Sequence, residues 1–159
     1  MLVRPLRDNP AAVPILAAWF KAEWPDFFAS QSAEQIADRR FRPALTAQSL
    51  PTVLVAEEGG ELCGTVALRA EASGRRKDLG PWASGLYVPP PFRGRGLGRL
   101  LLETAVAEAG RLGFDWVYGA TNRIRDLLLA LGWELVGTDE YEGGEAVELF
   151  RHRTGLASR

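Results

Sequence analysis

Apolar and polar positions along the chain follow two different periods, and each period predicts a different element. Residues 53–55 and 62–68 are short apolar runs on either side of Gly59 and Gly60, a pattern typical of a β-hairpin. Residues 96–113 instead repeat leucine and alanine every three or four positions, which predicts an amphipathic helix. The chain therefore combines hairpin-forming strands with helices that can cover a sheet.

Two more helices are predicted nearer the N-terminus. Pro10 suits the first turn of the first helix, and Asp8 or Asn9 before it is a suitable N-cap. Ser32 begins the second helix and is followed three positions later by Gln35, a pair typical of a capping box. Both helices precede the hairpin along the chain.

The whole chain gives the order β-α-α-β-β-β-α-β-α-β-β, with a second Gly-Gly hairpin at Gly143 and Gly144. This order predicts the α/β (α+β) class, with a mixed central sheet of about six to seven strands and helices on both faces. The 159 residues fit one domain. We expect the domain to span residues 1–153 and a flexible tail to form residues 154–159.

Composition and charge restrict the partners. The net charge is -1 and the sequence pI is about 5.9, so no basic excess indicates nucleic acid or an anionic membrane as a partner. The one cysteine, Cys63, lies in a strand-like run and is expected to be buried, and the one histidine, His152, excludes a His/Cys metal cluster. No apolar run approaches the ~20 residues of a membrane span, and the N-terminus lacks the apolar segment of a signal peptide. We therefore expect a cytoplasmic protein without a metal.

The stretch LYVPPPFRGRGLGRLLLE, residues 86–103, carries the clearest functional signal. Gly94, Gly96 and Gly98 alternate with arginines directly before the predicted helix. A helix N-terminus has unpaired N–H groups and a partial positive charge, and glycine lets an anion approach them. The pattern indicates a phosphate-binding turn, with a solvated turn as the alternative. Neither a Walker loop nor a dinucleotide fingerprint fits this spacing.

This stretch resembles the acetyl-CoA-binding core of the GNAT acetyltransferase superfamily. The family pattern is a strand ending in valine, a turn, Arg/Gln-x-x-Gly-x-Gly/Ala and a helix, and here the motif runs from Arg93 to Gly98. LGFDWVYGATNRIRDLLLALGWELVG, residues 112–137, is similar to the family's later strand, short helix and next strand. The resemblance covers roughly residues 50–150 well and the first 50 weakly. It implies that the predicted sheet has the GNAT fold.

The resemblance also implies a site for acetyl-CoA as the acetyl donor. Backbone N–H groups of the glycine turn would hold the pyrophosphate. The strand before the turn, which splays from its neighbour in the family, would bind the pantetheine arm, and an asparagine after the next strand would contact the same arm. The cofactor-binding residues implied in this way are Leu86, Tyr87, Val88, Arg93, Gly94, Arg95, Gly96, Leu97, Gly98, Arg99 and Asn122.

The chain departs from the family at the catalytic positions. Many members have a tyrosine four residues before the glycine of the LGF or LGW motif, placed to protonate the leaving thiolate, and here that position is Leu128. The strand before the turn has no Asp or Glu, and its side-chain hydroxyls are those of Ser84 and Tyr87. Glu23 lies in the segment that covers the acceptor site by analogy with the family. The catalytic candidates are therefore Glu23, Ser84 and Tyr87, with no general acid assigned.

These observations predict an N-acetyltransferase that moves an acetyl group from acetyl-CoA to a primary amine of a small molecule or peptide by direct attack. The missing tyrosine motivates an alternative, an acyl-CoA-binding sensor or interaction module without transferase activity. A longer acyl donor and, more distantly, a nucleotide-binding Rossmann domain are further alternatives. The sequence leaves the acceptor and the oligomeric state open, a homodimer included.

Overall fold

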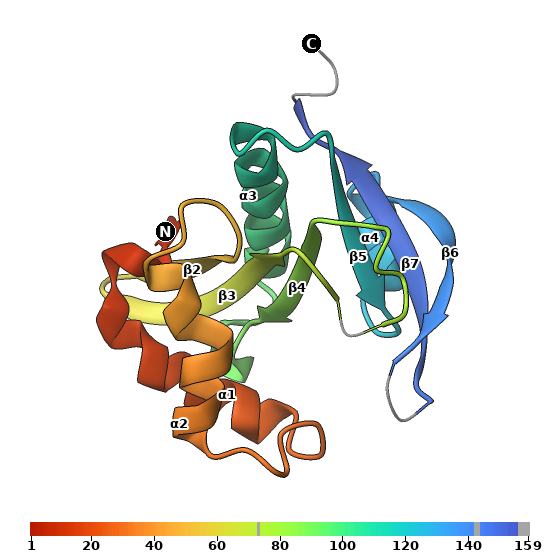
Figure 1. Ribbon diagram of the computed structural model, residues 1–159. Coiled ribbons are helices and arrows are strands. Elements are labelled where there is room, and N and C mark those ends of the chain that lie inside the picture. Colours follow the sequence, from red (N-terminus) through yellow and green to blue (C-terminus); the bar gives the residue numbers. More distant parts are fainter. Residues whose placement is uncertain (73, 142–143, 156–159) are drawn as a thin grey trace.

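The computed structural model describes residues 1–72, 74–141 and 144–155, and within them seven strands form one sheet (Figure 1). The strands are β1 (Leu2–Pro5), β2 (Thr52–Glu58), β3 (Glu61–Arg69), β4 (Trp82–Tyr87), β5 (Trp116–Thr121), β6 (Glu134–Glu140) and β7 (Ala146–Arg153). The α-helices are α1 (Val13–Glu23), α2 (Ala33–Ile36), α3 (Leu97–Arg111) and α4 (Arg125–Ala130). Shorter helical turns are η1 (Leu6–Asp8), η2 (Pro10–Ala12), η3 (Ala37–Phe41), η4 (Arg42–Leu45) and η5 (Pro90–Phe92).

The sheet is mixed, with the strand order β1-β2-β3-β4-β5-β7-β6. Neighbouring strands are antiparallel except β4 and β5, which run parallel and are connected through α3. A parallel pair needs such a crossover connection, because a hairpin can join only antiparallel strands. The predicted order of elements and the predicted mixed sheet with helices on both faces are confirmed.

The core consists of two main apolar layers, one on each face of the sheet. Side chains of β2 alternate between them, so that Val53 and Val55 pack with α1 and α2 while Leu54 packs with α3 and α4. Cys63 belongs to the α3 layer and is fully buried, as predicted, and burial raises the pKa of its thiol. The two layers place α1 and α3 on opposite sides of the central strands.

Two predictions about helix starts have different outcomes. The capping box is confirmed: Ser32 Oγ accepts the Gln35 N–H at 3.1 Å, and Gln35 Oε1 accepts the Ser32 N–H at 2.9 Å. The cap predicted for the first helix is wrong. Neither Asp8 nor Asn9 caps it, because the chain first makes η2 and the Asn9 side chain donates to Glu57 Oε1 at 2.7 Å.

The helix that begins at Ser32 does not continue as a regular α-helix. After Ile36 it widens into η3, a π-helical turn, and then tightens into the 3-10 turn η4. Such changes of pitch rotate side chains relative to a regular helix and are frequent at functional sites. Arg40 is carried by this turn and reaches the cavity described below.

The ends of the hairpins and of the chain complete the fold. The first predicted hairpin is confirmed, with Gly59 and Gly60 at φ 59° and 82° between β2 and β3. Gly143 of the second predicted turn lies outside the described residues, while β6 and β7 pair as antiparallel strands. Thr154, the first residue of the predicted tail, is buried and hydrogen-bonded through its hydroxyl, and residues 156–159 lie outside the described residues. None of the described helices is long and apolar enough to cross a membrane.

Candidate active site

Strands β4 and β5 pair at one end only and separate beyond it (Figure 1). Their parallel register is limited to Trp82 and Tyr118. β4 remains paired with β3 as far as Tyr87, and β5 with β7 as far as Thr121. Within the described ranges, residues 84–87 therefore have no strand partner on the β5 side. This is the divergence that the family resemblance implies.

A bulge in β4 lies next to this opening. The register between β3 and β4 shifts between Thr65 and Ala67. Gly85 lies in the bulge at φ 63°, and a Cβ there would be 2.9 Å from Phe20 Cζ. A side chain at this position would be strained and would clash, so only glycine fits. The bulge interrupts the β3–β4 ladder near Leu86, within the segment predicted to bind pantetheine.

The glycine turn leaves the start of α3 without a side-chain cap. The helix begins at Leu97 with Gly96 as N-cap, and no side chain of the described residues accepts its first N–H groups. Gly94 and Gly96 both have φ 80°, and a Cβ at either position would meet nothing within 4 Å. A Cβ at Gly98 would be at ordinary contact distance, 3.7 Å from Leu127 Cδ2. Open space thus lies in front of an uncapped helix N-terminus, an arrangement suited to phosphate.

The three arginines of the turn have different surroundings. Arg93 lines the cavity, and its Nε donates to the backbone at the end of β4 at 2.8 Å. Arg95 forms an ion pair with Glu58 at 3.2 Å. Arg99 forms one with an acid of its own helix at 2.7 Å. Neither Arg95 nor Arg99 lines the cavity, so Arg93 is the arginine of this turn that brings charge to it.

A cavity of about 840 Å³ extends from the glycine turn through the opening between β4 and β5 to the side of α1. Its volume lies within the range of small-molecule sites. Most of the predicted cofactor-binding residues line it, namely Leu86, Tyr87, Val88, Arg93, Gly94, Gly96, Leu97, Gly98 and Asn122.

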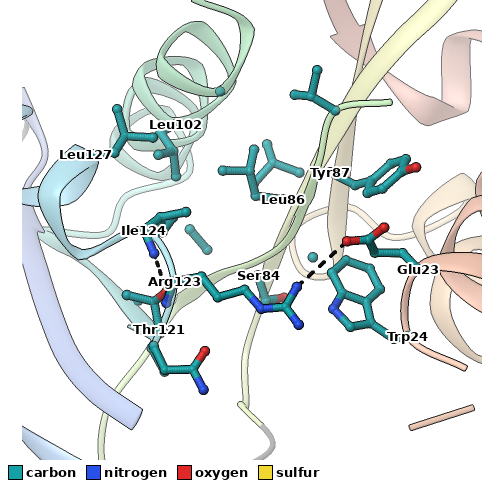
Figure 2. Close-up of a pocket in the computed structure, with 18 of the residues that line it drawn as sticks. Glu23, Trp24, Ser84, Leu86, Tyr87, Leu102, Thr121, Arg123, Ile124 and Leu127 are labelled. Atoms are coloured by element: carbon teal, nitrogen blue, oxygen red, sulfur yellow. Dashed lines mark hydrogen bonds and ion pairs between the residues drawn. The ribbon is translucent and has the colours of Figure 1, made fainter. Parts of the chain in front are cut away.

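An ion pair crosses this cavity, as Figure 2 shows. Arg123 Nη1 lies 3.7 Å from Glu23 Oε1, so the loop before α4 is joined to the end of α1. Thr121 Oγ1 accepts the N–H groups of Arg123 and Ile124, each at 3.0 Å. This hydroxyl shapes the loop that directs Arg123 toward Glu23, one of the catalytic candidates.

The other two catalytic candidates, Ser84 and Tyr87, also line the cavity. Ser84 pairs with Ala67 of the α1 layer and therefore faces α1. Its Oγ is buried and has no hydrogen-bond partner among the described residues. The Tyr87 ring packs between Trp19 and Trp24, with centroid distances of 5.5 and 6.1 Å. Ser84 thus offers an unused hydroxyl, whereas Tyr87 forms part of an aromatic wall.

Leu128, at the position of the family's tyrosine, is buried and brings no polar group to the cavity. Tyr141, directly after β6, also lines the cavity. Burial raises the pKa of Tyr141, with the charges of Glu145 and Asp139 adding to the effect, so its phenol stays protonated at neutral pH. On the same wall, Asn122 Nδ2 donates to Glu145 Oε1 at 2.6 Å.

Comparison with known proteins identifies the family. A model described as "Acetyltransferase (GNAT) family" matches residues 16–125. The chain belongs to this family. The protein is therefore an acetyl-CoA-dependent GNAT acetyltransferase. Among curated proteins, no significant sequence match is found.

Solved structures of GNAT enzymes share the fold of this acetyltransferase. An aminoglycoside 6'-N-acetyltransferase complexed with coenzyme A has a TM-score of 0.76 at 16% identity, covering 96% of this chain and 97% of that chain. The aminoglycoside 6'-N-acetyltransferase from Enterococcus faecium has a TM-score of 0.74 at 16% identity and the same coverage. YncA from Salmonella typhimurium, in a structure with its cofactor acetyl-CoA, has a TM-score of 0.68 at 20% identity, covering 96% of this chain and 93% of that chain.

Three residues of this GNAT site are not among those expected from the sequence, namely Thr121, Arg123 and Arg40. Thr121 ends β5 and its hydroxyl accepts N–H groups two and three positions later, a turn typical of Ser and Thr, so it could have been found from the sequence. Arg123 and Arg40 carry no local signal, because their neighbours in the cavity come from distant segments.

Proposed function

We propose that this GNAT acetyltransferase transfers the acetyl group of acetyl-CoA to a primary amine of a small molecule or peptide, by direct attack. One observation carries the proposal. A single cavity connects the uncapped start of α3 with the α1 side of the sheet, and it passes through the opening beside β4. Donor and acceptor can therefore approach the same point from opposite sides.

The residues on the α3 side fit acetyl-CoA. Its pyrophosphate would lie on the N–H groups of the glycine turn, where the positive φ values and the open space favour close approach of an anion. The pantetheine arm would follow the backbone from Leu86 of β4 to Val88, which has no strand partner on the β5 side among the described residues, with Asn122 on the opposite wall. Apolar side chains of α3 and α4, among them Leu102 and Leu127, line the same passage (Figure 2).

The acceptor side supplies the groups that direct attack needs. The amine nitrogen forms a bond to the acetyl carbon, the carbon–sulfur bond breaks, and the thiolate leaves with the electron pair. Glu23, held by Arg123, is the group we assign as acceptor of the proton released by the amine. A backbone N–H of β4 that faces the carbonyl oxygen would stabilise the developing charge. Because Leu128 has no proton to give, the thiolate is protonated by water in this mechanism.

The residues on the α1 side of the cavity restrict which amines can be the acceptor. There the lining includes the aromatic side chains of Phe20, Trp24 and Phe27 and the carboxylates of Glu23 and Asp26. Three of the matched structures with the same fold are named aminoglycoside acetyltransferases, so aminoglycosides belong in any panel of candidate acceptors.

We predict that Ser84→Ala weakens acceptor binding without affecting the donor. The Ser84 hydroxyl is buried in the cavity and has no partner among the described residues, so a hydrogen bond to the amine would satisfy it. Loss of one such bond should raise KM for the acceptor by about tenfold. Ser84→Thr keeps the hydroxyl and serves as the control. Unchanged acceptor KM in Ser84→Ala would contradict this role.

The proposed function is tested by release of free thiol. We expect the pure protein to bind acetyl-CoA in calorimetry and to release CoA when a suitable amine is added from a panel of amino acids, polyamines, aminoglycosides and N-terminal peptides. Mass spectrometry of the product should show one added acetyl group on nitrogen. Tight binding of acetyl-CoA without thiol release on any amine would contradict the transferase proposal and favour an acyl-CoA-binding module.

A further inference from the structure

The α1 side of the cavity carries positive charge that the transfer chemistry does not use. Arg40, on the π-helical turn η3, lines the cavity and is half-buried. Its guanidinium carbon lies 5.4 Å from the ring centroids of both Phe27 and Phe28. The two ring planes are nearly perpendicular, at 81°, so cation–π contacts from two directions restrain the guanidinium. The planar fork is therefore preorganised at the wall of the acceptor cavity.

A second arginine, Arg69, contacts the turn that carries Arg40. Arg69 follows Ala67 by two positions in β3, so both side chains face α1. Its Nη2 donates to the backbone oxygen of Arg40 at 2.7 Å. Its Nε is buried and has no hydrogen-bond acceptor among the described residues. Arg69 thus supports the turn that carries Arg40 and keeps an unused donor beside it.

No carboxylate of the described residues lies within 4.0 Å of either guanidinium, whereas ten other arginines of the described residues form ion pairs with acids. Burial lowers the pKa of Arg40, and burial together with the charge of Arg40 lowers the pKa of Arg69 to about 10. Two like charges close together in a partly buried site are unfavourable unless an anion joins them.

This anion is not supplied by acetyl-CoA in the arrangement proposed above. The glycine turn that suits the pyrophosphate precedes α3 and packs with the α3 layer. Arg40 packs on Phe28 of the α1 layer, across the sheet. The anion that Arg40 would bind must therefore belong to the molecule that enters from the α1 side, which is the acceptor.

We propose that the acceptor carries a carboxylate as well as the reacting amine, and that Arg40, supported by Arg69, binds this carboxylate. The proposal rests on the proposed function and narrows its acceptor to amino acids and related zwitterions. Arg40 would offer two parallel N–H donors to the carboxylate. The protonated Tyr141 phenol on the opposite wall is a further donor. Glu23, also on the cavity wall, would face the amine.

An enzyme with this carboxylate site should discriminate against polycationic acceptors. A polyamine or an aminoglycoside would bring ammonium groups toward Arg40 and Arg69, which like-charge repulsion disfavours. A zwitterion instead meets a carboxylate near its ammonium group and arginines near its carboxylate. Charge complementarity of this kind selects among ligands of equal size.

The test compares L-α-amino acids with their amides, for example L-phenylalanine with L-phenylalaninamide, in the thiol-release assay. Each pair has the same side chain and an α-amine, and the amide lacks the carboxylate; because its amine also has a lower pKa, kcat/KM is compared as pH profiles rather than at one pH. We expect kcat/KM for the best amino acid to exceed that of its amide by about 30-fold, the effect of a charged, bidentate hydrogen bond. Amides that react as well as the acids would overturn the proposal.

Two variants locate the effect at Arg40. In Arg40→Gln the preference for the acid should fall to within about threefold of the amide, with the affinity for acetyl-CoA unchanged. Arg39→Gln removes the same charge from the neighbouring exposed position, which does not line the cavity, and should keep the preference. Arg69→Lys retains a charge behind Arg40 and should give an intermediate preference. A preference that survives in Arg40→Gln would overturn the assignment.

A readout without turnover distinguishes failure of this proposal from failure of the proposed function. N-acetyl-L-phenylalanine and its amide are added to the protein with CoA, and the melting temperature is measured. The acid should raise it in the wild type and in Arg39→Gln but not in Arg40→Gln. Equal shifts with acid and amide would overturn the carboxylate site even if acetyl transfer occurs. If the protein shows the acid-specific shift but binds no acetyl-CoA, the carboxylate site is supported and the proposed transferase function is refuted.

Discussion

Gly98→Asp is expected to abolish binding of acetyl-CoA while leaving the protein fully folded. Gly98 is in the first turn of α3, and a Cβ there would meet Leu127 and Leu86 only at contact distances of 3.7 and 3.9 Å. Its φ is not positive, so an L-residue can adopt the backbone conformation. An aspartate in the first helical turn also interacts favourably with the helix dipole, and replacing glycine within a helix generally adds stability.

The same carboxylate would stand beside the N–H groups that we assign to the pyrophosphate. Repulsion between charges about 4 Å apart at an effective dielectric of about 20 amounts to about 4 kcal/mol, so the Kd for acetyl-CoA should rise by at least about 100-fold. Calorimetry gives the Kd, and thermal unfolding checks that the melting temperature is unchanged or higher.

Two further variants separate charge from size at this position. Gly98→Asn has the shape of aspartate without its charge and should weaken binding much less. Gly98→Ala matches the alternative residue of the family pattern, Gly/Ala, and should bind normally. If Gly98→Asp kept an affinity within about threefold of the wild type, the phosphate-binding turn would have to lie elsewhere.

The elements of the fold could be predicted because each has a local cause. The turn at Gly59 and Gly60 needs residues that accept positive φ, and the capping box at Ser32 needs only residues three positions apart. The start of α3 follows from the glycines before it. The cap predicted at Asn9 is wrong because the Asn9 side chain donates instead to Glu57 of β2, a residue distant in sequence.

Only the parts of the candidate site that are expected to act through backbone groups could be predicted from the sequence. The glycine turn and the second half of β4 line the cavity as the resemblance implies. The arginine side chains could not be placed, since Arg95 pairs with Glu58, which is distant in sequence. The same holds for the ion pair between Glu23 and Arg123, which forms because the end of α1 and the loop before α4 meet at the cavity.

Glu23→Gln is expected to lower kcat by about 100-fold, the lower end of the contribution of a general base. Glutamine keeps the size of glutamate and can still accept a hydrogen bond from Arg123, so the wall of the cavity should persist. It cannot take the proton that the amine loses as it attacks the thioester. The Kd for acetyl-CoA should stay within about twofold, because Glu23 lies on the α1 side of the cavity.

The pH dependence and a neighbouring variant identify the role of Glu23. Without a base, only acceptor that is already neutral in solution can react, so kcat/KM of Glu23→Gln should rise about tenfold per pH unit below the pKa of the amine. The wild type should rise less steeply, since Glu23 can take the first proton from a bound ammonium, and the second proton, released after the nitrogen attacks, then leaves to water. Asp26→Asn removes a second carboxylate from the same wall and should keep the wild-type pH profile. A larger loss of kcat in Asp26→Asn than in Glu23→Gln would transfer the role of base to Asp26, and unchanged kcat in both would place the base outside α1 and the loop that follows it.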